Sequence, residues 1–450
     1  MPYKTYMTDK KNLYTARQTL RKGAEIRRRL WLPTLLFGDG LVMSVLAITM
    51  IMLRRFGLDT AETTLIIALF CLPLLLRPLF EMIVAHFWGT TKVWILSAQF
   101  ISAMVLSAIA FMLSTASWLQ TTLCFMPFFT CAAVFYDIAL HRFYVNEKPN
   151  TWSATSTMAT LTRFIKHCGY ATMFVAIGIF AMIGGNMEVV TRNIRYSWSL
   201  VFYILAAIEL VLWLWHSIFL PGGPHGYALP KTTAGLHRGE FKLALHRMLH
   251  RKSDIMDLVF FVFFLLPETL LVIIGALFVI DKPHYGGLGL APQEFALTQG
   301  TVAVIAIMVG YKVGKQAICC GGLRRWLLPA ALVLPLHGAA MLYLSLHTTA
   351  TLGVICALLA VGNAAFGFAL SAVKAIAQGF VGGAYDTTLR HAIAQTLVAA
   401  PFIITNLFAG RLLLSIGYRQ LFVVAMYLYA VTLLVATIAF FFNKYLDRKQ

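Results

Sequence analysis

Two similar stretches of sequence divide the chain: Gly57-Leu58-Asp59-Thr60-Ala61-Glu62 and Gly289-Leu290-Ala291-Pro292-Gln293-Glu294. Both begin with Gly-Leu and end with a glutamate, and a long apolar run follows each of them. Internal repeats of this kind are typical of membrane proteins that are built from two related halves. We therefore predict that each stretch precedes the second helix of one half.

The composition predicts a membrane protein. Of the 450 residues, 59% are hydrophobic and only 12% are charged, whereas about a quarter of the residues in a soluble domain are charged. The apolar runs have the length of roughly 20 residues that a helix needs to cross a bilayer. We predict an all-α membrane protein with twelve transmembrane helices, at residues 32–53, 64–85, 93–113, 118–140, 157–183, 199–219, 256–280, 294–313, 327–346, 352–374, 391–414 and 420–443.

The stretch 220–255 separates the spans into six and six. It contains Pro221-Gly222-Gly223-Pro224 and then a basic segment, so it is predicted to be a linker. The expected organisation is an arm (1–31), a six-helix bundle (32–219), the linker (220–255), a second six-helix bundle (256–443) and a tail (444–450). Two such bundles, related by an axis along the membrane normal, constitute the major facilitator fold.

The distribution of positive charge predicts the orientation. The formal net charge is +19, which by itself would suit a nucleic-acid partner. Lysine and arginine, however, concentrate in the arm, the linker, residues 312–325 and the tail. In the predicted topology these segments lie on one side of the bilayer, and the positive-inside rule makes that side cytoplasmic. Both termini are thus expected in the cytoplasm and no nucleic-acid partner is expected.

Motifs for nucleotide or metal binding do not occur in the sequence. There is no Gly-x-x-x-x-Gly-Lys-Ser/Thr pattern, and the seven cysteines have no metal-binding spacing. We predict no cofactor and no metal, and we do not expect ATP-driven transport.

Several short motifs resemble the muropeptide permease (AmpG-like) branch of the major facilitator superfamily. They are Leu72-Pro73, Arg77-Pro78-Leu79-Phe80, Gly89-Thr90 and Asp137-Ile138-Ala139. The resemblance implies proton-driven import of a peptidoglycan fragment across a bacterial inner membrane. The chain departs from that branch at His141, where the branch has a second aspartate. Another oligosaccharide, a peptide or a siderophore-like organic anion therefore stays open as the substrate.

Ionisable residues in the spans are candidates for function, because each costs roughly 2.5–3.5 kcal/mol at membrane depth. The candidates for proton coupling are Asp39, Asp137, His141 and Glu268. Asp39 lies between two glycines, and Glu268 follows Pro267, which is expected to interrupt its helix. For each candidate the alternative is a structural pair or a helix-end position. Lys374 is a candidate partner of Glu268 and a candidate for substrate binding.

Arg77 and Glu81 lie one helical turn apart, so an ion pair between them is expected. Alternatively, Arg77 binds an anionic group of the substrate, with Glu81 nearby. Glu209 and His216 are seven positions apart and could share a helix face, where a buried pair is expected and a ligand site is the alternative. Four aromatic residues are candidates for stacking on a sugar ring, although ordinary packing is the alternative for each: Phe135, Tyr136, Phe366 and Phe368. Three basic residues are candidates for a gate: Arg163, Lys166 and Arg390.

A membrane enzyme or sensor is the alternative class of function. It would gather His, Asp or Glu residues at one interface with catalytic spacing, whereas here the ionisable residues are spread over six helices. That scatter favours a central passage. We therefore expect a monomeric, non-enzymatic transporter whose partners are a small-molecule substrate, protons and the lipid bilayer.

Overall fold

Every regular element that the structure describes is a helix. The computed structural model describes residues 31–86, 89–146, 157–220, 246, 250, 252–381 and 387–442, with side chains except at 85–86, 144–146, 157–171, 174, 252–253, 387–388 and 442. The predicted arm and tail, most of the predicted linker, and the side chains of the gate candidates Arg163 and Lys166 lie outside this description. The all-α prediction holds for the described part.

The first helix is Trp31–Arg55. The elements that follow it up to residue 220 are α2 (Thr60–Phe70), α3 (Leu72–Leu75), α4 (Arg77–His86), α5 (Thr91–Met112), α6 (Trp118–Asn146), α7 (Thr157–Thr191) and α8 (Ile194–Phe219). The elements after the linker are α10 (Lys252–Phe263), α11 (Leu266–Ile280), η1 (Pro283–Tyr285), α12 (Pro292–Leu297), η2 (Thr298–Val302), α13 (Ala303–Gly321), α14 (Leu323–Val333), α15 (Pro335–Leu346), α16 (Leu352–Val381) and α17 (Thr387–Phe442).

Nine of the described helices are long and apolar enough to cross a membrane, and the bent pair Thr60–Leu75 and Arg77–Val84 makes ten if it forms one span. The prediction of twelve spans exceeds the ten that can be identified in the described part of the chain, for two reasons. Leu389–Phe441 is a single helical stretch that covers nearly all of two predicted spans, and the side chains of α7 are described without a gap only over Val175–Thr191, which is shorter than a span. Gly417 interrupts α17 with non-helical backbone angles (φ 76°, ψ 167°), between those two predicted spans.

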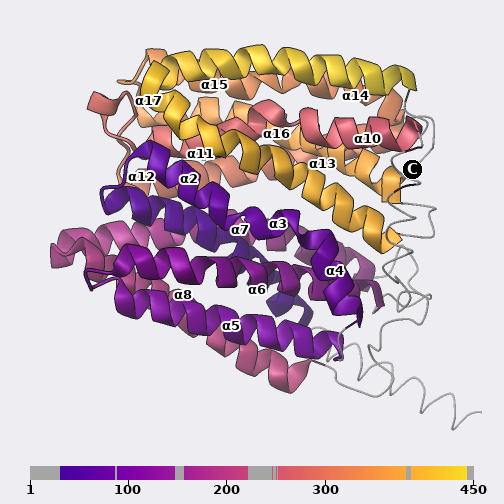
Figure 1. Cartoon of the computed structure of the whole chain (residues 1–450). Coiled ribbons are helices and arrows are strands. Elements are labelled where there is room, and N and C mark those ends of the chain that lie inside the picture. The colour runs from indigo at the N-terminus through magenta and orange to yellow at the C-terminus, as the bar shows by residue number, and fades with distance from the viewer. Residues whose placement is uncertain are drawn as a thin grey trace, which may run out of the picture.

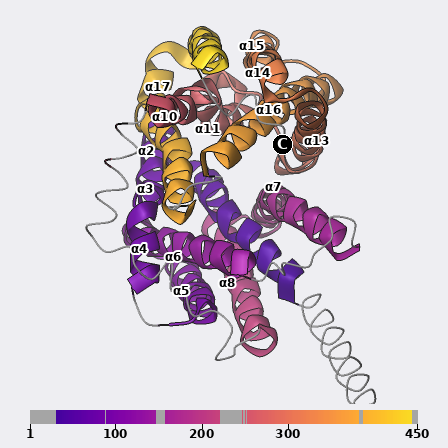
Figure 2. The same cartoon turned by 90° about the vertical axis from the view of Figure 1, so that its right-hand side faces the viewer.

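The helices form two groups (Figure 1). The first helix to α8 is called the N-half here, and α10 to α17 is called the C-half. The end where α2 and α12 begin is the α12 end, at the left of Figure 1, and the opposite end is the linker end. Seen from the linker end, α17 lies beside α2 to α4, and α7 lies beside α13 (Figure 2).

The predicted repeat has the same local geometry in both halves. Gly57 and Gly289 both have positive φ angles, of 94° and 66°, which a residue with a side chain rarely adopts. Glu62 then accepts a hydrogen bond from the N–H of Asp59, and Glu294 accepts one from the N–H of Ala291. Each glutamate thus caps the start of its helix, α2 or α12. The cap is reciprocal only in the N-half, because Asp59 has a side-chain acceptor and alanine has none.

Proline breaks explain where several spans bend. Proline lacks an N–H group and clashes with the carbonyl four residues earlier, so helices end close to it. Pro73 and Pro78 accompany the turns at Cys71 and Leu76, and the second span bends by 43° there. The break expected at Pro267 is present between α10 and α11. A carbonyl beside this break has a side-chain partner, since Thr432 donates to the carbonyl of Phe264 at 2.9 Å.

The two halves pack closely at the α12 end because glycines face each other or face small residues. A Cβ atom at Gly178 would lie 3.0 Å from the Cα atom of Gly300. A Cβ at Gly185 would lie 2.1 Å from the ring of Pro292, and one at Gly410 would lie 2.6 Å from the Cα atom of Ala61. Small residues let helix backbones approach closely within membranes. The α12 end is therefore closed between the halves.

Candidate functional site

An ion pair between Arg77 and Asp137 joins two elements of the N-half, α4 and α6. Arg77 is the first residue of α4, directly after the break at Leu76, and its Nη1 atom donates to Asp137 of α6. Arg77 is 4% exposed, whereas the side chain of Asp137 is 26% exposed. Within the described part of the chain, Nε and Nη2 of Arg77 are buried and have no hydrogen-bond partner. These two atoms form the guanidinium edge that can hold a carboxylate with two parallel bonds.

The expected pair between Arg77 and Glu81 is wrong. Glu81 instead accepts from Nε and Nη2 of Arg142 at 3.0 and 2.6 Å, and Nη2 also donates to the Glu81 carbonyl at 2.9 Å. Both residues are more than 90% buried. A buried charge needs a close partner with good geometry. The neighbouring helix α6 supplies Asp137 for Arg77 and Arg142 for Glu81. Glu81 is thus engaged in a structural pair.

Asp39 faces the same ion pair from the first helix. Its charge interacts electrostatically with both Arg77 and Asp137. Oδ1 of Asp39 is buried and lacks a partner in the described structure. The neighbouring Gly38 leaves room for Tyr136, whose hydroxyl donates to the carbonyl of Leu35 at 2.8 Å. The structure therefore brings three predicted residues together: Asp39, Arg77 and Asp137, which we call the charge cluster.

Two histidines connect the charge cluster to the C-half. His141 lies one turn after Asp137 in α6, and its ring stacks on that of His391 in α17, with centroids 4.1 Å apart and planes within 8°. Both imidazoles also interact electrostatically with Asp137. His141 was predicted to belong to the site, whereas His391 was not among the predicted site residues. Contact between α6 and α17 is a tertiary property that no local pattern indicates.

The aromatic candidates pack within the halves. Phe135 stacks on Phe80 and Trp94 at centroid distances of 4.7 and 5.3 Å. Tyr136 is 1% exposed. In the C-half, the ring of Phe366 lies 6.3 Å from that of His337, and the ring of Phe368 lies 6.0 Å from that of Trp326. Stacking of any of these rings on a sugar remains a prediction.

Glu268 lies in a buried network inside the C-half. It is 1% exposed, and its carboxylate oxygens lie 2.6 Å from Nδ1 of His337 and 2.7 Å from the hydroxyl of Tyr429. Lys374, which we expected as its partner, instead lies over the ring of Tyr311 at 5.3 Å. His337 and Tyr429 were missed because nothing in the sequence shows that α15 and α17 face α11.

The gate candidate Arg390 pairs within the C-half. Its Nη2 atom donates to Asp254 at 2.7 Å, its Nη1 atom donates to the carbonyl of Phe380 at 3.3 Å, and the guanidinium carbon lies 5.0 Å from the centre of the Phe380 ring. Arg390 is thus used to fasten α17 to α10 and α16.

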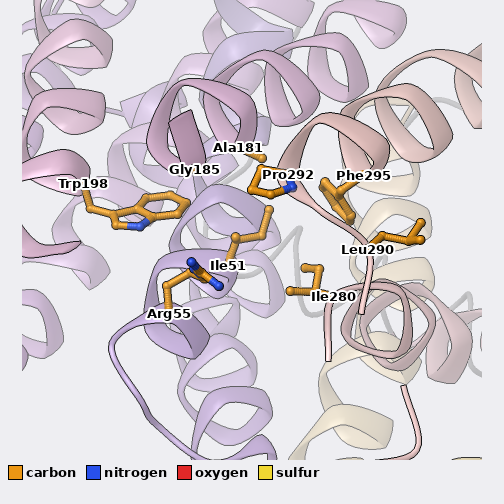
Figure 3. Close-up of a pocket in the computed structure, with 9 residues that line it drawn as sticks. All are labelled: Ile51, Arg55, Ala181, Gly185, Trp198, Ile280, Leu290, Pro292 and Phe295. Carbon is orange, nitrogen blue, oxygen red and sulfur yellow. The ribbon is translucent and has the colours of Figure 1, made fainter. Parts of the chain in front are cut away.

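A pocket lies between the halves at the α12 end, away from the charge cluster (Figure 3). Arg55 and Trp198 line it from the N-half, and Pro292 and Phe295 line it from the C-half. Arg55 and Trp198 both donate to the carboxylate of Glu188. Nε and Nη2 of Arg55 and the indole nitrogen of Trp198 are thus engaged with Glu188, and the other residues that line the pocket are apolar. The charge cluster, which has unpartnered polar atoms, is the better candidate site.

Comparison with known proteins shows the fold. No protein-family model and no curated protein sequence matches the chain. The solved structure of the nucleoside transporter NupG matches with a TM-score of 0.68 at 14% identity, over 93% of this chain and 99% of that chain. A D-xylose–proton symporter matches with a TM-score of 0.64 at 14% identity, over 94% and 98%.

A bacterial homologue of the human lysosomal transporter Spinster, in an inward-facing and unoccupied conformation, matches with a TM-score of 0.59 at 18% identity, over 91% of this chain and 94% of that chain. These proteins are all transporters of the major facilitator type. The chain is thus a multi-pass membrane protein with the fold of the major facilitator transporters.

Proposed function

We propose that the protein is a secondary active transporter that couples proton movement to the import of a small organic solute. In this proposal twelve helices span a bacterial inner membrane, with bundles at 32–219 and 256–443 and with the termini and the linker end in the cytoplasm. The two bundles rock about a central site, so that the α12 end and the linker end open in turn. The closed α12 end is one state of that cycle.

The observation that carries this proposal is the partly exposed pair of Asp137 with the buried Arg77. A carboxylate that is both paired and accessible can release its partner when it gains a proton, since protonation removes its charge. Arg77 then becomes available to an anionic group of the substrate through its unpartnered edge. In the reverse step, substrate release lets Arg77 and Asp137 pair again and the proton leaves.

The position of this pair next to the other half supports a role in coupling. His141 and His391 extend from Asp137 across to α17, so a change of charge at Asp137 acts on a contact between the halves. A ligand or proton can shift a conformational equilibrium only by interacting differently with the two states. Here the difference would arise from the contact of His141 with His391, because rocking of the halves would change the distance between α6 and α17.

The substrate that we propose first is a peptidoglycan fragment of the anhydro-muropeptide class, because it carries the carboxylates that Arg77 would bind. The short motifs quoted above favour the same class. Another oligosaccharide, a peptide or a siderophore-like organic anion is the alternative. The neighbours in structure transport nucleosides and D-xylose, so a nucleoside and a pentose belong in any test of substrates.

The test is uptake into proteoliposomes with and without an imposed pH gradient. Labelled anhydro-muropeptide, a disaccharide, a dipeptide, D-xylose and a nucleoside would be compared. We expect gradient-driven accumulation of an anionic solute, a loss of more than tenfold in Arg77→Lys, and loss of accumulation but not of substrate exchange in Asp137→Asn. Arg411→Lys is the matched control, because Arg411 is exposed in α17. Accumulation by Asp137→Asn at the wild-type level would overturn the coupling role.

A further inference from the structure

Another carboxyl of the N-half has no ion-pair partner among the described residues. Glu209 of α8 is 1% exposed, and neither of its carboxylate oxygens has a hydrogen-bond partner among the residues that the structure describes. An ionised carboxylate that is buried without a partner is strongly disfavoured, and such groups bind a proton instead. The expected pairing of Glu209 with His216 is wrong, since His216 lies 2.9 Å from Oε1 of Gln99 and 3.0 Å from the hydroxyl of Thr34.

Glu209 faces the interior of the N-half. Glu209, Leu212 and His216 follow one another at intervals of three and four on the buried stripe of α8. Leu212 lies 3.4 Å from the position that a Cβ atom would take at Gly38 of the first helix, and His216 contacts Gln99 of α5. The stripe thus packs between the first helix and α5, away from lipid.

The same interior holds other polar atoms without partners. A Cβ atom at Gly38 would lie 2.9 Å from the hydroxyl of Tyr136 and 3.6 Å from Nε2 of Gln99, so these groups meet at the glycine. Gln99 is 1% exposed, and its Nε2 atom has no partner in the described part, like Oδ1 of Asp39. Tyr136 also interacts electrostatically with Asp39, Glu209 and Asp137.

A donor and several acceptors that lie close together but do not bond to each other indicate an ordered water between them. Buried polar groups are nearly always satisfied, by protein or by water, and a buried water typically makes about three hydrogen bonds. Gln99 supplies the donor, and Glu209 and Asp39 supply the acceptors. Gly38 contributes by having no side chain to fill the space.

We propose that Glu209 is a neutral carboxylic acid in an internal hydrated proton site, where water connects it with Gln99 and Asp39. The groups that face the site are Asp39 of the first helix, Gln99 of α5, Tyr136 of α6 and His216 of α8. The exchange step requires Asp39 to be ionised beside the Arg77 guanidinium. Glu209 then gives its proton through water to the Asp39 carboxylate, so that Glu209 becomes charged and Asp39 neutral. Because Asp39 belongs to the charge cluster, this part of the inference rests on the proposed function, whereas the neutral state of Glu209 does not.

The test is infrared spectroscopy of the full chain in liposomes at neutral pH, in H2O and in D2O. We expect a carbonyl band of a protonated carboxyl that shifts in D2O and is lost in Glu209→Gln. Glu81→Gln is the matched control: Glu81 is equally buried but ionised with Arg142, so this variant should keep the band. Asp39→Asn should keep the band and slow its exchange in D2O.

Two results would overturn the proposal: a band that Glu209→Gln leaves at full intensity, or a band that does not exchange in D2O, which would mean a dry site. If Glu209→Gln does not fold, Glu209→Asp replaces it, and the band should then persist at a shifted frequency. An unchanged frequency would again contradict the assignment. Uptake measured in the same liposomes keeps the two proposals separate. An exchanging Glu209 band without solute uptake would reject the proposed function alone.

Discussion

Arg54 and Asp281 join the two halves at the α12 end. Nε and Nη2 of Arg54, near the end of the first helix, donate to the same oxygen of Asp281 at 3.1 and 2.6 Å. The hydroxyl of Tyr418, directly after the break at Gly417, donates to the other oxygen at 2.6 Å. The two charged side chains are 13% and 4% exposed. An ion pair this well buried and bonded fastens the closed end, and it has to separate whenever that end opens.

Asp281→Asn should therefore weaken closure of the α12 end. Removing one partner of a buried pair costs about 3–5 kcal/mol, because the other charge stays buried without compensation. The measurement is thiol labelling of a cysteine introduced at Ile51, which lines the pocket between the halves, in a chain without the seven native cysteines. We expect faster labelling in Asp281→Asn.

Tyr418→Phe is the matched control for this experiment. It removes one donor from Asp281 and leaves the ion pair, so its effect should be smaller, about 1.5–3 kcal/mol, as is usual for a hydrogen bond to a charged group. Equal labelling rates in the wild type and Asp281→Asn would show that the pair does not hold this end closed.

A side chain at Gly185 should keep the α12 end from closing. The Cβ atom of Gly185→Ala would lie 2.1 Å from Pro292, whose ring has little freedom to move. We expect the variant to label faster at position 51 and to lose transport while it still folds. Gly353→Ala is the control, since a Cβ there meets no atom within 4 Å. If Gly185→Ala transports like the wild type, the contact with Pro292 is not required for the cycle.

Glu81 and Arg142 should determine stability and not substrate choice. Glu81→Gln leaves the Arg142 guanidinium buried without its countercharge, so we expect a loss of about 3–5 kcal/mol, visible as a lower midpoint of thermal unfolding in detergent. The double variant Glu81→Met with Arg142→Met should recover most of that loss, because apolar side chains of similar volume replace a buried pair at little cost. No recovery in the double variant would mean that the two residues act independently.

The sequence predicted local geometry better than it predicted partners. The repeat at Gly57 and Gly289 could be recognised because the glycine of the turn and the capping glutamate lie close together in the sequence. The pair of Arg77 with Glu81 was predicted from helical spacing, which contributes only about 0.2–0.5 kcal/mol. The packing of α4 against α6 outweighs this small contribution, and Arg77 pairs with Asp137 of α6.

The same holds for the candidate site: its residues could be selected from the sequence, whereas their contacts between helices could not. Asp39, Arg77, Asp137 and His141 could be selected from the sequence because charge is rare in apolar spans. His391 and His337 could not be assigned partners, since the rotation of one helix against another is set by packing over the whole bundle. Glu209 was recognised as buried, and its lack of a partner became evident only from the three helices around it.

Glu268→Gln should abolish gradient-driven accumulation and leave the protein folded. Glutamine has the same shape and can still accept from Tyr429 at the position where Glu268 now accepts at 2.7 Å, so packing is retained while the ionisable group is lost. The measurement compares accumulation under a pH gradient with exchange of labelled solute at equal pH. Exchange should persist, because it requires the conformational change but no net proton transfer.

The matched variant is Tyr429→Phe, which leaves the carboxylate in place with His337 at 2.6 Å and removes only the hydroxyl. If Glu268 carries a proton, Tyr429→Phe should keep accumulation, because the ionisable carboxyl group itself is retained. If the network is only structural, both variants should lose stability alike and neither should separate accumulation from exchange. Unchanged accumulation in Glu268→Gln would remove this residue from coupling and leave the charge cluster of the N-half as the place where protons and solute meet.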